Sequence, residues 1–339
     1  MRKTIFPFII FCFYLQVYGS KLCFNDAFQI IEKIKLSQEK ELISAISDFK
    51  VDNEGNLWIA DNKSYRIRKY NQKGKLILSF GRRGQGPGEF IRIQSFVFDK
   101  KRNIIYLISS NRINIFNKKG KFLKSFPSRL IKSFKFLSDG SIIANEIEIT
   151  EENKWYFLKK LNSNFKPIKS FYPAHPLVYT HQFILAHAYF DIDLKDNIYA
   201  IQSEDYTIYK FDSNGKLIKK FSKKGKYYIP PPFDFKVNKM DRRQMNKWLN
   251  SFSKITNLFT LKKKRLILVE FLNNVEKKEY FIDIYDVDGN FIKGSIKTNL
   301  PLLGVDEKQN IYFLDEKLNE KFDIDYFIVK CILTTKYNK

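Results

Sequence analysis

The sequence contains little cysteine, glycine and proline, and it is poor in acidic residues. Its 3 cysteines cannot build a framework of several disulfides. The 14 glycines and 10 prolines are outnumbered by 33 Phe and 19 Tyr, a balance that favours strands over helices. Only 36 acidic residues face 60 Lys and Arg, which leaves a formal charge of +24. That excess acts on partners and solubility and excludes no fold.

Long hydrophobic runs are also missing after the first twenty residues, and a mean hydropathy of −0.35 excludes a multi-span membrane protein. With 44% hydrophobic residues against 28% charged, the chain is too apolar to be disordered. Its 339 residues can hold one large domain or two, and all-β domains often reach this size as one unit.

The first twenty residues have the layout of a secretory signal peptide. Arg2 and Lys3 form a short positive region, residues 5–15 are continuously apolar, and residues 17–20 offer small residues for cleavage. The apolar run is shorter than the ~20 residues of a membrane-spanning helix. We therefore predict a signal peptide at 1–20 and a protein exported to the periplasm or the extracellular medium. An uncleaved N-terminal anchor is the alternative.

Cysteine usage agrees with export. Cys12 leaves with the signal peptide, so Cys23 and Cys331 are the only pair in the mature chain. An oxidising compartment allows them to form a disulfide. Leu22 precedes Cys23 where a lipoprotein would need a small residue, so no lipid anchor is expected.

The rest of the chain is an internal repeat. Each copy has an apolar strand ending in Asp, a polar turn, second and third strands, an Asn/Asp-x-x-Gly-Lys turn and a fourth strand. The turn glycines supply the positive φ that tight hairpins need. The clear copies span residues 49–80, 96–126 and 190–221, and weaker copies span 134–171, 255–296 and 302–333.

Six copies of four antiparallel strands predict an all-β fold, a six-bladed β-propeller that forms a single domain over residues 21–339. The last copy shows only three strands before the sequence ends. We predict that the spare apolar run at 28–36 is its outer strand, paired antiparallel with 325–333 to close the ring. This pairing would bring Cys23 close to Cys331 and suggests a disulfide, with two free buried thiols as the alternative.

The copies resemble the blades of NHL-type propellers within the TolB-like six-bladed superfamily. Residues 81–90 (GRRGQGPGEF) are similar to a Gly-x-Gly-Pro-Gly-Glu-Phe segment of exported bacterial propellers. The resemblance covers nearly all of residues 28–336 and implies the fold. It implies function only broadly, because such propellers include binding proteins, scaffolds, lactonases and lyases. One departure is that Ile93 lies where these blades often carry a proline before the inner strand.

One segment departs from the repeat. After three prolines at 230–232, residues 238–254 place Met245, Trp248 and Phe252 at helical spacing. We predict a short inserted helix between the fourth and fifth blades. Its apolar face either caps the ring or binds a partner, and the capping interpretation is favoured.

The first candidate site is the glycine-rich loop at 81–92. In this fold the loops between blades share a face with the loops between second and third strands, and variable loops on a rigid scaffold commonly carry function. Glycines expose backbone N–H groups, and arginines can hold a carboxylate or phosphate. The loop lacks the Lys-Ser/Thr of a P-loop, so nucleotide binding is not supported. The ligand candidates are Arg82, Arg83, Gln85, Glu89, Arg92, Tyr65 and Arg66.

The second candidate is a group of three histidines. His175, His181 and His187 fall within thirteen residues between the third and fourth blades, with Asp191 and Asp193 nearby. Such residues can hold zinc or act in acid–base catalysis, which would make the protein a metal-assisted hydrolase or lyase. No Glu-x-x-His or His-x-His spacing is present, and we favour packed or solvated histidines.

The third candidate is a set of aspartates at the ends of the first strands: Asp52, Asp99, Asp193 and Asp306. A ring of carboxylates could bind calcium. An aspartate at this position more often caps the following turn through backbone hydrogen bonds, and this structural role is favoured.

These observations favour an exported, non-catalytic binding or scaffold module, with its ligand on the loop-rich face. The expected partner is a protein or an anionic envelope polymer or glycan, and no cofactor is expected, with calcium or zinc as the alternative. Binding of nucleic acid through the basic surface is another alternative, which export disfavours. We expect a monomer.

Overall fold

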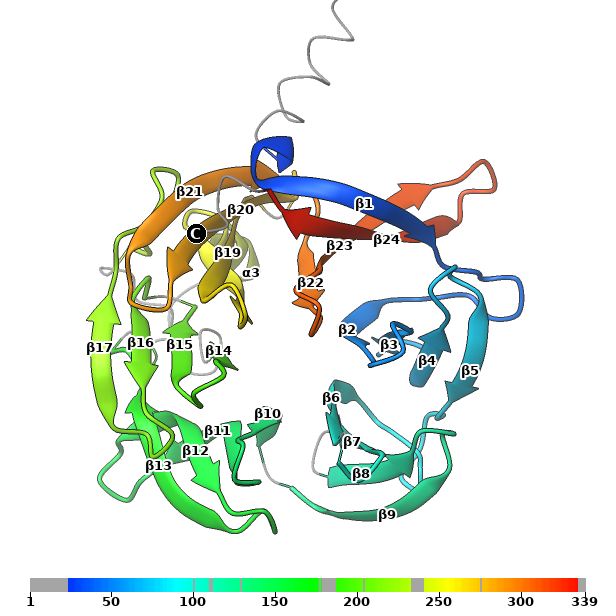
Figure 1. Cartoon of the computed structure of the whole chain (residues 1–339), viewed down its shortest axis with the longest axis horizontal. Coiled ribbons are helices and arrows are strands. Elements are labelled where there is room, and N and C mark those ends of the chain that lie inside the picture. The colour runs from blue at the N-terminus through cyan, green and yellow to red at the C-terminus, as the bar shows by residue number, and fades with distance from the viewer. Residues whose placement is uncertain are drawn as a thin grey trace, which may run out of the picture.

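The protein is a ring of six four-stranded antiparallel sheets, seen face-on in Figure 1. This computed structural model describes residues 24–334 except 100, 110–111, 129, 177, 179–186, 204, 233–240 and 275. Each sheet is one blade, and its first strand lies innermost. The predicted six-bladed β-propeller is therefore confirmed.

Five blades follow the chain in order, and the sixth uses both ends of the described chain. Blade 1 contains β2 (Ile46–Val51), β3 (Leu57–Asp61), β4 (Arg66–Tyr70) and β5 (Leu76–Phe80). Blade 2 contains β6 (Ile93–Asp99), β7 (Ile104–Ser109), β8 (Arg112–Asn117) and β9 (Phe122–Pro127). Blade 3 contains β10 (Ile131–Phe136), β11 (Ile142–Ile149), β12 (Trp155–Leu161) and β13 (Pro167–Pro173). Blade 4 contains β14 (Ala188–Ile192), β15 (Ile198–Gln202), β16 (Ile208–Phe211) and β17 (Leu217–Phe221). Blade 5 contains β18 (Lys254–Leu261), β19 (Leu266–Asn274), β20 (Glu279–Asp286) and β21 (Phe291–Thr298). Blade 6 contains β22 (Leu302–Val305), β23 (Ile311–Leu318), β24 (Ile324–Leu333) and β1 (Phe28–Lys35).

The ring has two faces. The turn face carries the turns between strands 1 and 2 and between strands 3 and 4 of each blade. The loop face carries the connections between strands 2 and 3 and the crossovers to the next blade. The first strand of a blade therefore starts near the loop face and ends near the turn face.

The turns between strands 3 and 4 share one hydrogen-bond pattern. In blade 1, Asn71 Oδ1 accepts the N–H groups of Lys73 and Lys75, each at 3.0 Å, and Gly74 takes φ +78°. Asn117, Asn162, Asp212 and Asp286 accept the same pair of N–H groups in blades 2 to 5. The Asn/Asp side chain thus fixes the register of this hairpin in blades 1 to 5, and blade 6 has no such turn because its strands 3 and 4 are β24 and β1.

Blade 6 closes the ring by pairing the two ends of the chain. Strand β1 pairs antiparallel with β24 from Phe28↔Leu333 to Lys35↔Phe327, which confirms the predicted outer strand. Phe28 is completely buried, and its ring lies 5.3 Å from that of Phe313, between centroids. Closure therefore combines backbone hydrogen bonds with an aromatic contact in the core between blades 5 and 6.

Glu270 on β19 links blade 5 to blade 6 from a fully buried position. Its Oε1 accepts the N–H of Leu302 at 2.6 Å. Its Oε2 accepts hydrogen bonds from Thr256 Oγ1 at 2.7 Å and Asn257 Nδ2 at 2.9 Å. Burial raises the pKa of Glu270 to about 7, although these three donors favour the ionised carboxylate.

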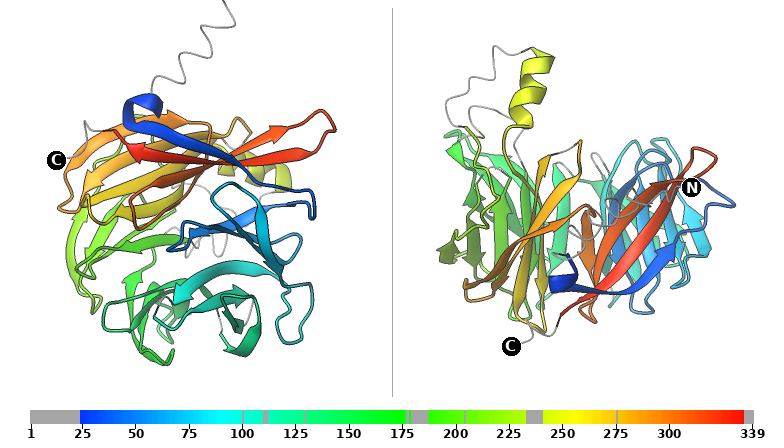
Figure 2. Two further views of the ribbon diagram at one scale, coloured as in Figure 1. Left: turned by 45° about the vertical axis from the view of Figure 1, so that its right-hand side comes forward. Right: turned by 90° about the horizontal axis from the view of Figure 1, so that it is seen from above.

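The inserted helix is confirmed as α3 (Arg242–Leu249), which stands out from one face of the ring in Figure 2. Asp241 caps its N-terminus, and Trp248 and Phe252 lie 5.0 Å apart between ring centroids in a small cluster separate from the blade cores. The apolar face of α3 thus contributes to a cluster within the insertion. Residues 238–240 of the predicted segment lie outside the described residues.

Truncation of Phe28 to alanine is expected to lower the free energy of unfolding by about 3–5 kcal/mol, because it leaves a cavity at the ring closure. Urea unfolding monitored by fluorescence would measure the loss. Ile31→Ala is the matched control, since Ile31 lies on the same strand and is 51% exposed. We expect the control to change stability by less than about 0.5 kcal/mol. Equal losses in the two variants would contradict the proposed closure.

Glu270 is expected to make the folded protein more stable at acidic pH. The unfolded chain releases this proton near pH 4.5, whereas the folded protein holds it up to about pH 7. The stability that Glu270 contributes is therefore complete below pH 4.5 and is lost as the pH rises through 7, at about 1.36 kcal/mol per pKa unit. Urea unfolding of wild type and Glu270→Gln between these pH values should show this slope in the difference between the two free energies of unfolding, because His175, His187 and Asp283 titrate in both proteins. Parallel pH profiles would refute the assignment.

Candidate functional site

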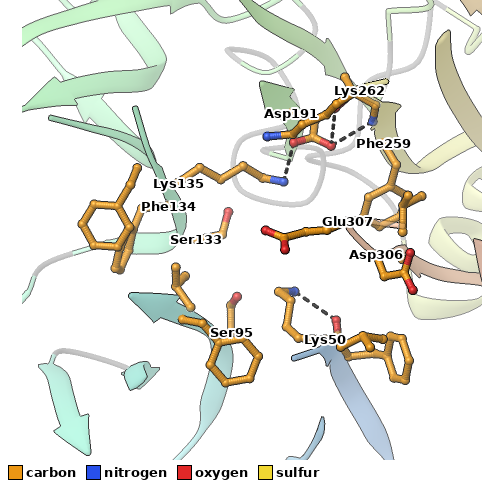
Figure 3. Close-up of a pocket in the computed structure, with 18 of the residues that line it drawn as sticks. Lys50, Ser95, Ser133, Phe134, Lys135, Asp191, Phe259, Lys262, Asp306 and Glu307 are labelled. Carbon is orange, nitrogen blue, oxygen red and sulfur yellow. Dashed lines mark hydrogen bonds and ion pairs between the residues drawn. The ribbon is translucent and has the colours of Figure 1, made fainter. Parts of the chain in front are cut away.

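A cavity of about 380 Å³ lies in the channel, on the side of the turn face. Figure 3 shows its side chains converging from the inner strands of different blades. One position, two residues before the first turn of each blade, supplies a lining residue in all six. The occupants of this position are Lys50, Val97, Lys135, Asp191, Phe259 and Gly304. One repeated backbone position therefore presents two cations, an anion and apolar groups to the same space.

Asp191 connects three blades at the wall of this cavity. Its Oδ1 accepts a hydrogen bond from Lys135 Nζ at 2.6 Å. Its Oδ2 accepts the N–H of Thr260 at 2.8 Å and the hydroxyl of Thr260 at 3.0 Å. Burial alone would raise the pKa of Asp191, but the charges of Lys135 and Lys262 and these hydrogen bonds hold it below its usual value. Asp191 is therefore an ionised group that fixes the position of Lys135.

Asp48 has the corresponding role between blades 1 and 2. Its Oδ1 accepts a hydrogen bond from Lys50 Nζ at 2.6 Å, and its Oδ2 accepts the hydroxyl of Ser95 at 2.8 Å and the N–H of Phe96 at 3.0 Å. Lys50 and Lys135 are thus both held by carboxylates that also bind a neighbouring blade. A site whose charged groups are held in this way is preorganised for a ligand.

The remaining lining combines hydroxyl groups with aromatic walls. Ser133 and Glu307 direct their polar groups into the space between Lys50 and Lys135 (Figure 3). Aromatic walls come from Phe49, Phe98, Phe134, Phe136 and Phe259. Apolar walls with a few fixed polar groups are typical of small-molecule sites, which start at roughly 300 Å³.

The aspartates predicted at the ends of the first strands cap turns. Asp52 Oδ1 accepts the N–H groups of Glu54 and Asn56 at 3.0 and 2.9 Å. Asp193 accepts hydrogen bonds from N–H groups of its own turn and from the hydroxyl of Tyr199. Asp306 does the same with its own turn and the hydroxyl of Tyr312. Asp99 accepts the N–H of Arg102 at 3.0 Å. These bonds match the favoured capping role, and of the four only Asp306 lines the channel cavity.

The glycine-rich loop is folded around its own glutamate. The Glu89 carboxylate accepts a hydrogen bond from Arg82 Nε at 2.7 Å and another from the N–H of Gly86 at 2.9 Å. Those donors are the groups that were predicted to bind an external anion. Arg83 lies over the ring of Tyr65 at 5.7 Å from its centroid. Gln85, another candidate, accepts a hydrogen bond from Arg112 through its backbone carbonyl. Arg66, the last candidate of this group, is half-buried on β4. A ligand role for this loop stays a prediction.

A basic group lies at the loop-face end of the channel strands. Arg92 comes from the glycine-rich crossover, Lys132 from β10 and His187 from the residue before β14. The pKa of His187 is lowered below its usual value. Partial desolvation is the larger cause, and the positive charges of Lys132 and Arg92 add to it. Two residues from separate sequence candidates, Arg92 and His187, are thus neighbours on this face.

The histidine-and-aspartate site is not assembled by the residues that the structure describes. His187 precedes β14 and Asp193 follows it, so at about 3.3 Å per residue they are roughly 20 Å apart. The backbone N–H of His175 donates to Gln202 Oε1 at 2.6 Å, and burial lowers the pKa of its ring. His181 lies outside the described residues. Within the described ranges, no group of three His, Cys, Asp or Glu side chains is placed to hold a metal ion.

Of the predicted disulfide, only Cys331 can be described. It is completely buried on β24, and burial raises the pKa of its thiol to about 12. Cys23 lies outside the described residues, as does the predicted signal peptide. The pairing stays a prediction. Over residues 24–334, with the gaps given above, no helix is long and apolar enough to cross a membrane.

Sequence reasoning missed Lys50, Lys135 and Lys262 as site residues. Each is a common residue in a lysine-rich chain, and no local motif surrounds it. The available signal was the repeat itself. When the six copies are aligned on their first turn, the position two residues before it holds Lys, Val, Lys, Asp, Phe and Gly. A position that faces a shared channel and differs between copies is a candidate for ligand contact.

Replacement of Asp191 by alanine is expected to lower the free energy of unfolding by about 2–4 kcal/mol, because it removes the buried partner of a partly exposed ion pair and leaves the Thr260 N–H and hydroxyl without this acceptor. Chemical denaturation would measure the change. Glu307→Ala, which removes an exposed carboxylate from the same cavity, should change stability by less than about 0.5 kcal/mol. If Asp191→Ala leaves the free energy of unfolding unchanged, the connection between the three blades does not stabilise the fold.

Comparison with known proteins supports the fold. The family model described as "Domain of unknown function (DUF4934)" matches residues 16–299. The structure is similar to a Bacteroides fragilis protein described as exported, with TM-score 0.66, 17% identity, and coverage of 90% of this chain and 95% of that one. It is also similar to a DUF4221 member from Bacteroides vulgatus, with TM-score 0.64, 12% identity, and 92% and 100% coverage. A streptogramin B lyase gives TM-score 0.51, 13% identity, and 91% and 98% coverage. No curated protein matches the sequence significantly. At these identities the likeness is one of fold.

Proposed function

The chain belongs to the DUF4934 family, and on this premise we propose that it is an exported, non-catalytic binding module that holds a small polar ligand in the channel cavity. Export rests on the signal-peptide layout of residues 1–20, followed by a single propeller. The likeness to NHL blades remains a prediction, as does a protein or glycan partner on the outer surface.

The observation that carries this proposal is the pair of lysines fixed by interblade carboxylates. Lys135 is held by Asp191 and Lys50 by Asp48, each at 2.6 Å. Because both lysine side chains are already held in place, little conformational entropy is lost when a ligand binds. This arrangement supports a binding role at the turn-face end of the channel, in place of the loop-rich face expected from the sequence.

The chemistry of the lining favours a small hydroxylated acid. Lys50, Lys135 and Lys262 can donate to a carboxylate, and Ser133 and Glu307 can pair with hydroxyl groups. The phenylalanine walls fit the apolar face of such a molecule. A cavity of about 380 Å³ admits a single sugar acid or hydroxy acid and excludes a polymer.

The proposal is tested by thermal shift with a panel of hydroxy acids and sugar acids, among them gluconate and galacturonate. A ligand present at about 100 times its Kd stabilises the folded state by about 2.7 kcal/mol, which gives a measurable rise in Tm. We expect this rise in the wild type and not in Ser133→Leu, whose larger apolar side chain would intrude between Lys50 and Lys135 and remove a hydroxyl group from the lining. Lys262→Gln should weaken the shift without blocking the space.

Ser222→Leu is the matched control, because Ser222 is exposed after β17 and does not line the cavity. It should keep the full ligand-induced shift. An equal shift in Ser133→Leu would place the ligand outside the channel. No shift with any acid of the panel would refute the ligand class.

A further inference from the structure

The seam between blades 2 and 3 differs from the other seams at one turn residue. Between strands 3 and 4, the left-handed position is glycine in blades 1, 2, 4 and 5, with φ between +73° and +89°. The equivalent residue of blade 3 is Phe165, at φ +61°. Its turn keeps the same hydrogen bonds, because Asn162 Oδ1 accepts the N–H groups of Asn164 and Lys166 at 2.9 and 3.0 Å. A bulky side chain therefore occupies a backbone position that favours glycine.

In blades 2, 4 and 5 this glycine lies directly against a phenylalanine of the preceding blade, whereas Gly74 of blade 1 lies against the backbone of Lys35. A Cβ at Gly120 would be 2.7 Å from the ring of Phe80, and one at Gly215 would be 2.6 Å from the ring of Phe171. The corresponding ring beside blade 3 is Phe126. It lies 4.9 Å from the ring of Phe165, between centroids, and is half-exposed, whereas Phe80 and Phe171 are buried.

The seam between blades 2 and 3 contains a groove of about 450 Å³, which we call the Phe165 groove. Its walls include Tyr106, Phe126 and Phe165, and the ring of Phe165 lies 5.5 Å from that of Tyr106. Its cations are Arg102 and Lys124, and no carboxylate is among its lining residues. Remaining polar groups come from Ser163 and Asn164 in the turn itself.

Arg102 is the charged group best placed for a ligand. Its side chain is 57% exposed, and its Nη1 is 3.4 Å from the hydroxyl of Tyr106 and 3.6 Å from Asp99 Oδ2. These long contacts leave donors of the guanidinium fork available for a carboxylate, which Arg can bind in bidentate fashion. A second cavity of about 460 Å³ shares Arg102 and Ser163 with the groove, and its lining adds Lys101 and the carboxylates of Asp99 and Asp139.

We propose that the Phe165 groove binds an acidic sugar residue within an anionic glycan, at a site independent of the channel. The aromatic rings offer surfaces for the C–H face of a pyranose, Arg102 and Lys124 pair with its carboxylate, and Asn164 and Ser163 bind hydroxyls. The channel cavity is too small for a polymer, but a groove on the surface can hold one residue while the chain continues in solvent.

The test is isothermal titration with trigalacturonate at low and at physiological ionic strength. We expect binding by the wild type and an affinity at least about tenfold lower in Arg102→Gln, the loss typical of a charge-assisted hydrogen bond. Phe165→Gly should lower the affinity similarly, because it restores the glycine of the other turns and removes one wall. Circular dichroism and a thermal melt would confirm that each variant is folded.

Three controls distinguish binding in the groove from binding elsewhere on the protein. Lys118→Gln removes the same charge from the partly exposed blade 2 turn and should leave the affinity unchanged. Ser133→Leu, which obstructs the separate channel cavity, should also leave it unchanged. Neutral maltotriose should bind at least about tenfold more weakly than trigalacturonate. Equal losses in Arg102→Gln and Lys118→Gln would indicate diffuse attraction to a basic surface and overturn the proposal. Undetectable trigalacturonate binding, or equal binding of maltotriose, would overturn it as well.

Discussion

Pairing of β1 with β24 is the constraint on which the rest of the protein depends. Each blade keeps an inner and an outer edge strand, and the ring is held closed because strands from both ends of the described chain share one sheet. Here the two ends of the described chain meet along the full length of β1, with Phe28 buried against Phe313. The inner strands then face one another across the channel at fixed distances, and side chains from distant parts of the sequence can form a site there.

The same architecture divides the residues of each copy into two groups. Turn residues such as Asn71 and Asp52 bind their own backbone, so their identity follows from the hairpin and repeats from blade to blade. Channel and seam residues contact other blades, so they can differ between copies without altering a hairpin. Lys135, Asp191 and Phe165 belong to this second group, and both proposed ligand sites are built from it.

The fold could be predicted from the sequence because its information is local: alternating strands, Asn/Asp-Gly turns and a spare strand at the N-terminus. The site could not, because proximity in the ring differs from proximity in sequence. The histidines lie close together along the chain, yet β14 places His187 and Asp193 at opposite ends of one strand. Lys50 and Lys135 are 85 residues apart and line the same cavity. In the glycine-rich loop the sequence could not show that Glu89 itself accepts hydrogen bonds from Arg82 and Gly86.

The composition of blade 6 also sets an order of events during synthesis. Strand β1 leaves the ribosome before all the other strands, and its partner β24 leaves last. Blades 1 to 5 can form one after another as each hairpin emerges, but the ring must stay open until the final strand is available. During that interval β1 is an unpaired edge carrying apolar side chains, a state open to pairing with another chain. Closure of this propeller therefore waits until the whole of blade 6 has left the ribosome.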